Sequence, residues 1–110
     1  MLNLPGNIRI FLYRADVNML LGFEGLSSLI EREFPQRLLT GALFVFLNRR
    51  RDRLKALYWD GDGLALWYKR LEKGVFSRSA DECVEMDRRE FLMLLEGITP
   101  KRLQNRFKIE

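Results

Sequence analysis

Residues 43–71 alternate apolar runs of strand length with turn-forming residues, and this alternation constrains the fold more than any other part of the chain. Leu43–Leu47 is fully apolar, Asn48–Asp52 has the composition of a loop, and Arg53–Trp59 returns as a second strand. A third strand is expected over Leu64–Leu71. Strands that follow one another through short turns pair in antiparallel fashion, so this segment is predicted to form a β-meander.

The turn between the second and third strands has the sequence Asp-Gly-Asp-Gly. Aspartate can bond to its own backbone and glycine supplies positive φ without steric cost, which favours a tight structural turn. The residues of this expected turn are Asp60, Gly61, Asp62 and Gly63. The two carboxylates could also bind Mg²⁺, since hard oxygen ligands suit that ion. A two-metal nuclease would need at least one more converging carboxylate, and nothing in the sequence fixes one in space.

The N-terminal half adds a strand and a helix. Asn7–Tyr13 carries apolar side chains on both faces, which predicts an interior strand. From Gly22 the apolar period becomes helical and predicts an amphipathic helix over Phe23–Glu33. Pro35 ends this helix, because proline lacks the N–H donor and disfavours helical backbone at Phe34.

The C-terminal half adds a short strand and a second helix. After a turn at residues 72–74, Val75–Phe76 is interpreted as a short fourth strand. Asp87 with Glu90 resembles a capping box, which marks a helix start, and Gly97 stands where a helix C-terminus favours glycine. The apolar stripe of this helix is interpreted as core first and partner surface second, and it consists of Phe91, Leu92, Leu94 and Leu95.

Together these patterns predict an α+β fold: a small antiparallel β-meander sheet with two amphipathic helices packed against it. A chain of 110 residues is too short for two independent cores. Residues 1–98 are expected to form the single domain. Residues 99–110 are expected to form a basic C-terminal tail, either a disordered arm or a short docked segment.

Composition argues against an enzyme. The chain has one cysteine, Cys83, and no histidine. This excludes an intrachain disulfide, a structural zinc site with its roughly four Cys or His ligands, and a Ser-His or Cys-His nucleophilic pair. No catalytic residue, metal or cofactor is predicted, and Cys83 is assigned no role.

No segment resembles a membrane helix or a signal peptide. The longest apolar runs, such as Leu43–Leu47, fall far short of the roughly 18 to 20 residues that a membrane helix needs. The N-terminus lacks the cationic start and the apolar stretch of a signal peptide. A cytoplasmic location without a membrane partner is therefore expected.

Positive charge concentrates at the loop between the first two strands of the meander. Residues 49–55 carry five basic side chains against one acid, Asp52, and this local net charge of +4 equals that of the whole chain. Cations at a hairpin tip are expected to splay outward, where they can neutralise phosphates. The candidate nucleic-acid-binding residues are Arg49, Arg50, Arg51, Arg53 and Lys55, extended on the adjoining strand by Lys69 and Arg70. The alternative is a solvated turn that keeps a hydrophobic sheet soluble.

Both tryptophans flank the expected Asp-Gly-Asp-Gly turn and are lesser candidates for base stacking or partner contact. A pairing of Trp59 with Leu64 is expected across this turn. Trp59 then lies on the same sheet face as Arg70. Trp67 lies on the opposite face together with Lys69. One face must cover the core, so about half of the aromatic rings in these strands are expected to serve packing alone.

Three runs of the sequence resemble one small bacterial family. They are GFEGL (Gly22–Leu26), GALFVFLNRRRDRLKALYWDGDGLALWYKRLEKGVF (Gly41–Phe76) and LLEGI (Leu94–Ile98). The family is the TnpB accessory protein of insertion-sequence family sixty-six, which is distinct from the RNA-guided nuclease that shares the TnpB name. The resemblance extends from about Ile8 to Ile98 and is most specific in the long central run.

The resemblance implies a non-catalytic accessory factor of transposition, because DNA cutting and joining belong to a separate, larger transposase. The resemblance implies the transposase of the element and a second small accessory protein as partners, and the basic hairpin adds DNA as an expected partner. No catalytic residue can be transferred, since none is defined for the family. The favoured hypothesis is an accessory protein that contacts DNA through its basic hairpin. The alternative is an interaction module that binds the transposase without touching DNA.

This chain departs from its relatives at two places. Where they typically read TDMRKGFDGL, it reads VNMLLGFEGL, so that Leu20 and Leu21 replace an Arg-Lys pair. If that pair contacts DNA in the relatives, this copy has lost the contact. Arg51 stands at a position that glycine often holds, which extends the basic hairpin.

Overall fold

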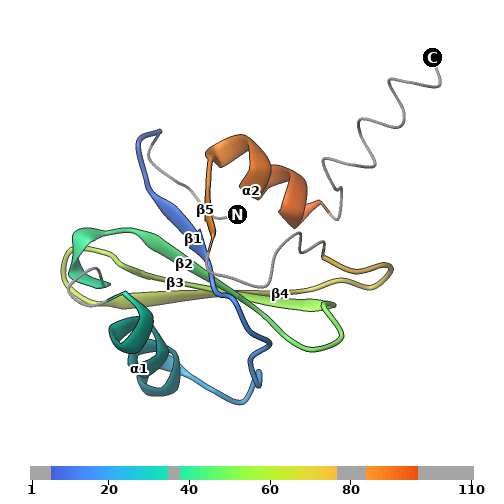
Figure 1. Ribbon diagram of the computed structural model, residues 1–110, viewed down its shortest axis with the longest axis horizontal. Coiled ribbons are helices and arrows are strands. Elements are labelled where there is room, and N and C mark those ends of the chain that lie inside the picture. Colours follow the sequence, from blue (N-terminus) through green and yellow to red (C-terminus); the bar gives the residue numbers. More distant parts are fainter. Residues whose placement is uncertain (1–5, 35–37, 77–83, 97–110) are drawn as a thin grey trace.

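The strands predicted from the alternation in residues 43–71 form the centre of the fold. The computed structural model describes residues 6–34, 38–76 and 84–96. In chain order the elements are β1 (Ile10–Leu12), α1 (Phe23–Glu33), the 3₁₀ helix η1 (Leu38–Thr40), β2 (Leu43–Leu47), β3 (Arg53–Trp59), β4 (Leu64–Arg70), β5 (Val84–Met86) and α2 (Arg88–Leu95). The predicted α+β class is confirmed, with one sheet and two α-helices (Figure 1).

The five strands lie in the order β4-β3-β2-β1-β5. The meander is confirmed, since β3 pairs antiparallel with both β2 and β4. The sheet as a whole is mixed, however, because β1 runs parallel to β2 and antiparallel to β5. α1 and η1 lie between β1 and β2 in the sequence, and a connection of that length lets the chain re-enter the sheet in the same direction. β1 is an interior strand as predicted, although only Ile10–Leu12 is regular.

Both faces of the sheet are covered, which corrects the expectation that one face covers the core. α1 lies on one face and α2 on the other (Figure 1). Successive residues of a strand point to opposite faces, so Phe44 packs in the cluster with α1 while Leu43 and Val45 pack in the cluster with α2. Every residue of β2 is buried, since this strand has neighbours on both edges and a helix layer on both faces.

Aromatic rings fill the space between the sheet and α1. The ring centroids of Phe11 and Phe44 lie 5.6 Å apart, and Phe34 lies 5.2 Å from Phe11 and 5.4 Å from Phe44. Leu26 and Ile30 of α1 are fully buried against this cluster. Full burial of one such side chain contributes about 1.5–3 kcal/mol, so these contacts fix α1 on the sheet.

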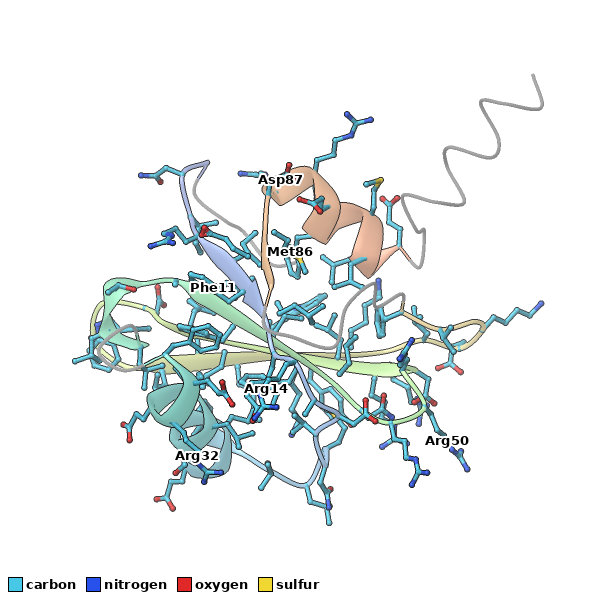
Figure 2. The ribbon with its side chains drawn as sticks, viewed as in Figure 1. Phe11, Arg14, Arg32, Arg50, Met86 and Asp87 are labelled. Atoms are coloured by element: carbon cyan, nitrogen blue, oxygen red, sulfur yellow. The ribbon has the colours of Figure 1, made fainter. Side chains whose placement is uncertain are left out.

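The start of α2 is the predicted capping box. The backbone N–H of Glu90 donates to the Asp87 carboxylate at 2.7 Å, and the backbone N–H of Asp87 donates to the Glu90 carboxylate at 3.1 Å. Figure 2 shows Asp87 at this helix start and Met86 between β5 and α2. The helix buries Phe91, Leu94 and Leu95 in the core on its side of the sheet.

The prediction of a fourth strand at Val75–Phe76 is wrong. These residues belong to no strand, and the last strand of the sheet is β5. The backbone N–H of Phe76 donates to the carbonyl oxygen of Arg51 in the β2–β3 loop, and the Phe76 ring is fully buried beside α2. The apolar character of Phe76 therefore reflects packing of one ring and not a strand ladder.

Four sequence interpretations concern residues outside the described ranges: the helix stop at Pro35, Cys83, the helix end at Gly97 and the tail at 99–110. The domain boundaries at residues 98 and 99 stay a prediction. No helix within the described residues is long and apolar enough to cross a membrane.

Candidate nucleic-acid interface

The basic loop between β2 and β3 is organised by Asn48. Its side-chain oxygen accepts a hydrogen bond from the backbone N–H of Arg53 at 3.0 Å, and its side-chain nitrogen donates to the Asp52 carboxylate at 2.7 Å. The backbone N–H of Arg51 also donates to the Asn48 carbonyl oxygen at 3.1 Å. Asn48 therefore ties both ends of the loop together and gives the arginines between them a defined backbone.

The one acid of this loop remains ionised. The hydrogen bond from Asn48 holds the pKa of the Asp52 carboxyl below its ordinary value of 3.8, and the positive charges of Arg53 and Arg50 act in the same direction. Burial opposes the shift but is outweighed. Asp52 thus contributes one negative charge to the loop, and the loop remains strongly positive because of its arginines.

A shallow, open depression of about 320 Å³ lies beside the hairpin tip. The segment after β1 forms its other wall, because the backbone N–H of Val17 donates to the Leu47 carbonyl oxygen at 2.9 Å and holds this segment along β2. The residues that line the depression are Asp16, Val17, Asn18, Met19, Asn48, Arg49, Arg50 and Arg53. Three arginines against one aspartate make the depression suited to an anion. Figure 2 shows Arg50 at this end of the sheet, pointing away from it.

Arg53 and Arg70 lie directly opposite each other on β3 and β4. Like charges at paired positions destabilise a sheet unless an opposite charge approaches them. Arg70 lies 3.5 Å from the Glu72 carboxylate, but both side chains are well exposed, so this ion pair contributes little. Arg70 therefore adds a fourth guanidinium group near the three arginines of the depression and increases the attraction of the depression for an anion.

Tyr68 is the aromatic residue that the structure places beside these arginines. Its hydroxyl lies 3.4 Å from a guanidinium nitrogen of Arg53, and 48% of the residue is exposed. A ring beside cations at a surface is the combination that binds bases and phosphates together. The expected pairing of Trp59 with Leu64 is confirmed, and this register puts Tyr68 on the same face as Arg70.

The expectation that Lys55 splays outward is wrong. Only 6% of this residue is exposed, and its Nζ atom donates to the backbone carbonyl oxygens of Met19 at 2.7 Å and Leu21 at 2.8 Å. It also lies 4.9 Å from the centre of the Tyr68 ring. Lys55 is buried because two carbonyl oxygens satisfy its charge, and it holds the turn before α1 against the sheet.

Lys69 is directed away from the depression. It lies on the α2 face of β4, where its Nζ atom donates to the carbonyl oxygen of Leu95 at 3.0 Å. A cation at the last turn of a helix complements the negative end of the helix dipole. The structure therefore separates Lys69 from Arg70, which were expected to extend one surface together.

Neither tryptophan adjoins the arginines. Trp59 ends β3 beside the 60–63 turn, six residues from Arg53, which corresponds to about 20 Å of strand. Trp67 lies on the α2 face and packs against the core there. Both rings are partly buried, so the structure places them away from the candidate interface.

The 60–63 turn lies at the end of β3 and β4 that is remote from the hairpin tip. The backbone N–H of Asp60 donates to the Gly63 carbonyl oxygen at 2.8 Å. Gly61 adopts a φ of +83°, whereas Gly63 does not use the positive φ region that was expected of it. Among the described residues, no three His, Cys, Asp or Glu side chains gather in a metal-binding arrangement, so nothing there adds ligands to Asp60 and Asp62.

Sequence reasoning missed the second wall of the depression. Residues 16–19 carried only weak turn signals, and their position depends on hydrogen bonds to β2 that no local pattern encodes. Leu20 directly follows this segment and is 90% exposed. The only sequence signal for the role of Asn48 in holding the loop together is the general preference of asparagine for loops.

The helix stripe that was considered as a partner surface is mostly core. Phe91, Leu94 and Leu95 are buried, and only Leu92 is substantially exposed, at 39%. The described part of α2 therefore offers a small apolar surface to a protein partner.

Comparisons with known proteins agree with the resemblance in the sequence. The profile of the family described as "IS66 Orf2 like protein" matches residues 8–105. The chain is similar to the uncharacterized protein y4jC of Sinorhizobium fredii, with 33% identity over 101 residues that cover 90% of this chain and 86% of the relative. It is also similar to the uncharacterized protein y4hO of the same organism, with 31% identity over 94 residues that cover 84% and 82% of the two chains. No solved structure matches the chain.

Proposed function

The chain belongs to the IS66 Orf2-like family, and from this premise we propose that it is a non-catalytic accessory protein of IS66 transposition that binds DNA phosphates through the β2–β3 hairpin. The observation that supports DNA contact most strongly is the gathering of guanidinium groups at one end of the sheet. Arg49, Arg50 and Arg53 line one depression, and Arg70 stands opposite Arg53.

The chemistry of this surface fits a polyanion better than a small ligand. The depression is shallow and open, so a small molecule would remain largely solvated in it. A DNA backbone presents repeated phosphates, and each one that an arginine neutralises releases a condensed counterion. Arg53 and Arg70 are brought together by different strands, and they can bind neighbouring phosphate oxygens bidentately. Tyr68 offers a ring face to a base or sugar beside them.

The transposase of the element and a second accessory protein are further proposed partners, on the basis of family context. The alternative function is an interaction module that binds the transposase without touching DNA. Salt separates the two functions, because phosphate binding weakens steeply with ionic strength whereas an apolar interface does not.

The test is a salt titration of binding to duplex DNA that carries the terminal repeat of the element, with a scrambled duplex alongside. Each phosphate contact adds about 0.9 to the slope of log affinity against log salt, so Arg49→Ala with Arg50→Ala should lower the slope by about 2. The matched control is Arg32→Ala with Arg89→Ala, which removes the same charge from exposed positions on the two helices.

A slope that falls only in the hairpin variant supports the proposal, and preference for the terminal repeat would add end recognition. Equal losses in both variants would show that net charge alone drives binding and would contradict a site at the hairpin. If the chain binds no duplex at low salt but binds the transposase, the interaction-module alternative stands.

A further inference from the structure

Within the described part of the chain, β4 is an edge strand with only β3 beside it. The hydrogen bonds from Asp60 to Gly63 and from Leu71 to Asp52 belong to one continuous register. Hydrogen-bonded pairs alternate along an antiparallel ladder, so this register determines which backbone groups of β4 point toward β3. Those groups belong to Ala65, Trp67 and Lys69. The N–H and C=O groups that point to the open edge belong to Leu64, Leu66, Tyr68 and Arg70.

The centre of this edge has none of the usual protection against pairing. Edge strands are commonly shortened, bulged, interrupted by proline, or given inward-pointing charges. β4 has seven residues, as many as β3, and contains no proline or bulge. Its cations stand only at one end, where Lys69 is already engaged with Leu95. Among the described residues only β3 pairs with this long, regular strand, so its outer edge is available to another strand.

We propose that β4 pairs antiparallel with β4 of a second copy of this chain, about a two-fold axis at Leu66. Leu66 then faces the partner's Leu66 and Leu64 faces the partner's Tyr68. The turn that carries Asp60 and Asp62 lies beside the end of the partner's strand where Arg70 stands. The strand pairs are apolar with apolar and lie on the α1 face. Beyond them, the acidic turn at one end of each strand adjoins the basic end of the other strand. A register centred on Trp67 would instead place Leu64 opposite the partner's Arg70, an apolar residue against a cation, so side-chain character favours the Leu66 register.

The pairing of the two β4 strands does not depend on the proposed function. Its consequence for DNA binding does rest on the proposed function. Antiparallel strands in one sheet are related by an axis perpendicular to the sheet, so both copies present α1 on the same side. The arginines of the two hairpins then lie on one side of a continuous sheet, at opposite ends of the paired strands. A dimer of this kind would offer a duplex two contacts in place of one.

The test is sedimentation velocity of the full chain over a range of micromolar concentrations, without DNA. Leu66→Pro removes the outward N–H at the two-fold axis and leaves the β3 ladder intact, because that N–H points away from β3. The dimer dissociation constant should rise at least about tenfold. Leu20→Ser is the matched control, since Leu20 is more exposed than any apolar residue of β4 but lies in another element.

A second variant pair tests the register without a change in the backbone. Asp62→Lys should weaken the dimer roughly tenfold, because it places a cation in the turn beside the partner's Arg70 at two symmetric places, and adding Arg70→Glu should restore it. Circular dichroism and thermal unfolding confirm that each variant is folded. A chain that stays monomeric throughout would overturn the proposal. So would a dimer that Leu66→Pro leaves unchanged, or one that Leu20→Ser abolishes.

Discussion

The Nζ atom of Lys55 lies 2.7 Å from the backbone carbonyl oxygen of Met19, a residue 36 positions earlier in the chain. A second bond to the carbonyl oxygen of Leu21 makes the ammonium a link between the middle of β3 and the turn before α1. A basic residue of the hairpin thus belongs to the core, while its neighbours belong to the surface. This division separates variants that affect stability from variants that affect binding.

Lys55→Met should lower the free energy of unfolding by about 1.5–3 kcal/mol, the range for a hydrogen bond to a charged group. The salt dependence of DNA binding by the folded variant should not change, because the ammonium does not reach the surface. Urea unfolding and the salt titration measure the two effects. Lys73→Met, at an exposed position, is the control for loss of charge. If the variant has unaltered stability and a lower slope of log affinity against log salt, Lys55 would instead be a residue that contacts DNA.

Arg51→Gly should leave the free energy of unfolding unchanged or raise it by up to about 1 kcal/mol. Arg51 has a φ of +61°, a conformation that costs a side-chain-bearing residue about 1–2 kcal/mol, while glycine adopts it freely at an entropic cost of about 0.5–1 kcal/mol. Thermal unfolding of the variant beside Arg50→Gly, where φ is not positive, provides the comparison. A clear loss of stability in the Arg51 variant would mean that its side chain makes contacts that outweigh the strain.

Gly61→Ala and Gly63→Ala should differ although the two glycines share one turn. Gly61 has a φ of +83°, so an alanine there should cost about 1 kcal/mol or more. Gly63 has no positive φ, and an added Cβ would meet no atom within 4 Å, so its variant should be nearly neutral. Denaturant unfolding of both variants tests this order. Equal costs would indicate that the turn has a different conformation in solution.

Asn48→Ala should raise the pKa of Asp52 toward its ordinary value of 3.8, since the amide of Asn48 is the largest cause of the lowered value. A carboxyl with a lowered pKa in the folded state stabilises the protein above the pKa of the unfolded chain. That stabilisation begins to fall as the pH drops below about 4 and is gone once the pH lies below the pKa of the folded state. Carboxyl NMR titration measures the shift directly. An Asp52 pKa that stays low in the variant would assign the shift to the backbone hydrogen bond of Asp52 and to the arginines instead.

Local pattern in the sequence was sufficient to determine several elements of this protein. The bounds of α1, β2 and β3 follow from apolar period and turn residues, and the pairing of Trp59 with Leu64 follows from the turn between them. The capping box before α2 is likewise readable from Asp87 and Glu90. These features depend on residues close together in the chain, whose preferences act before the fold forms.

The tertiary structure alone decided how these elements meet. A strand period shows which residues share a face, but it does not show that β1 enters beside β2 in parallel or that α1 and α2 cover opposite faces. Nor does it show that Lys55 is buried, because its burial depends on carbonyl oxygens supplied by a distant turn. The same distinction holds for the basic residues. The sequence alone shows that positive charge is concentrated near the hairpin. Long-range packing decides that the arginines gather at one end of the sheet while the lysines do not; these arginines are Arg49, Arg50, Arg53 and Arg70.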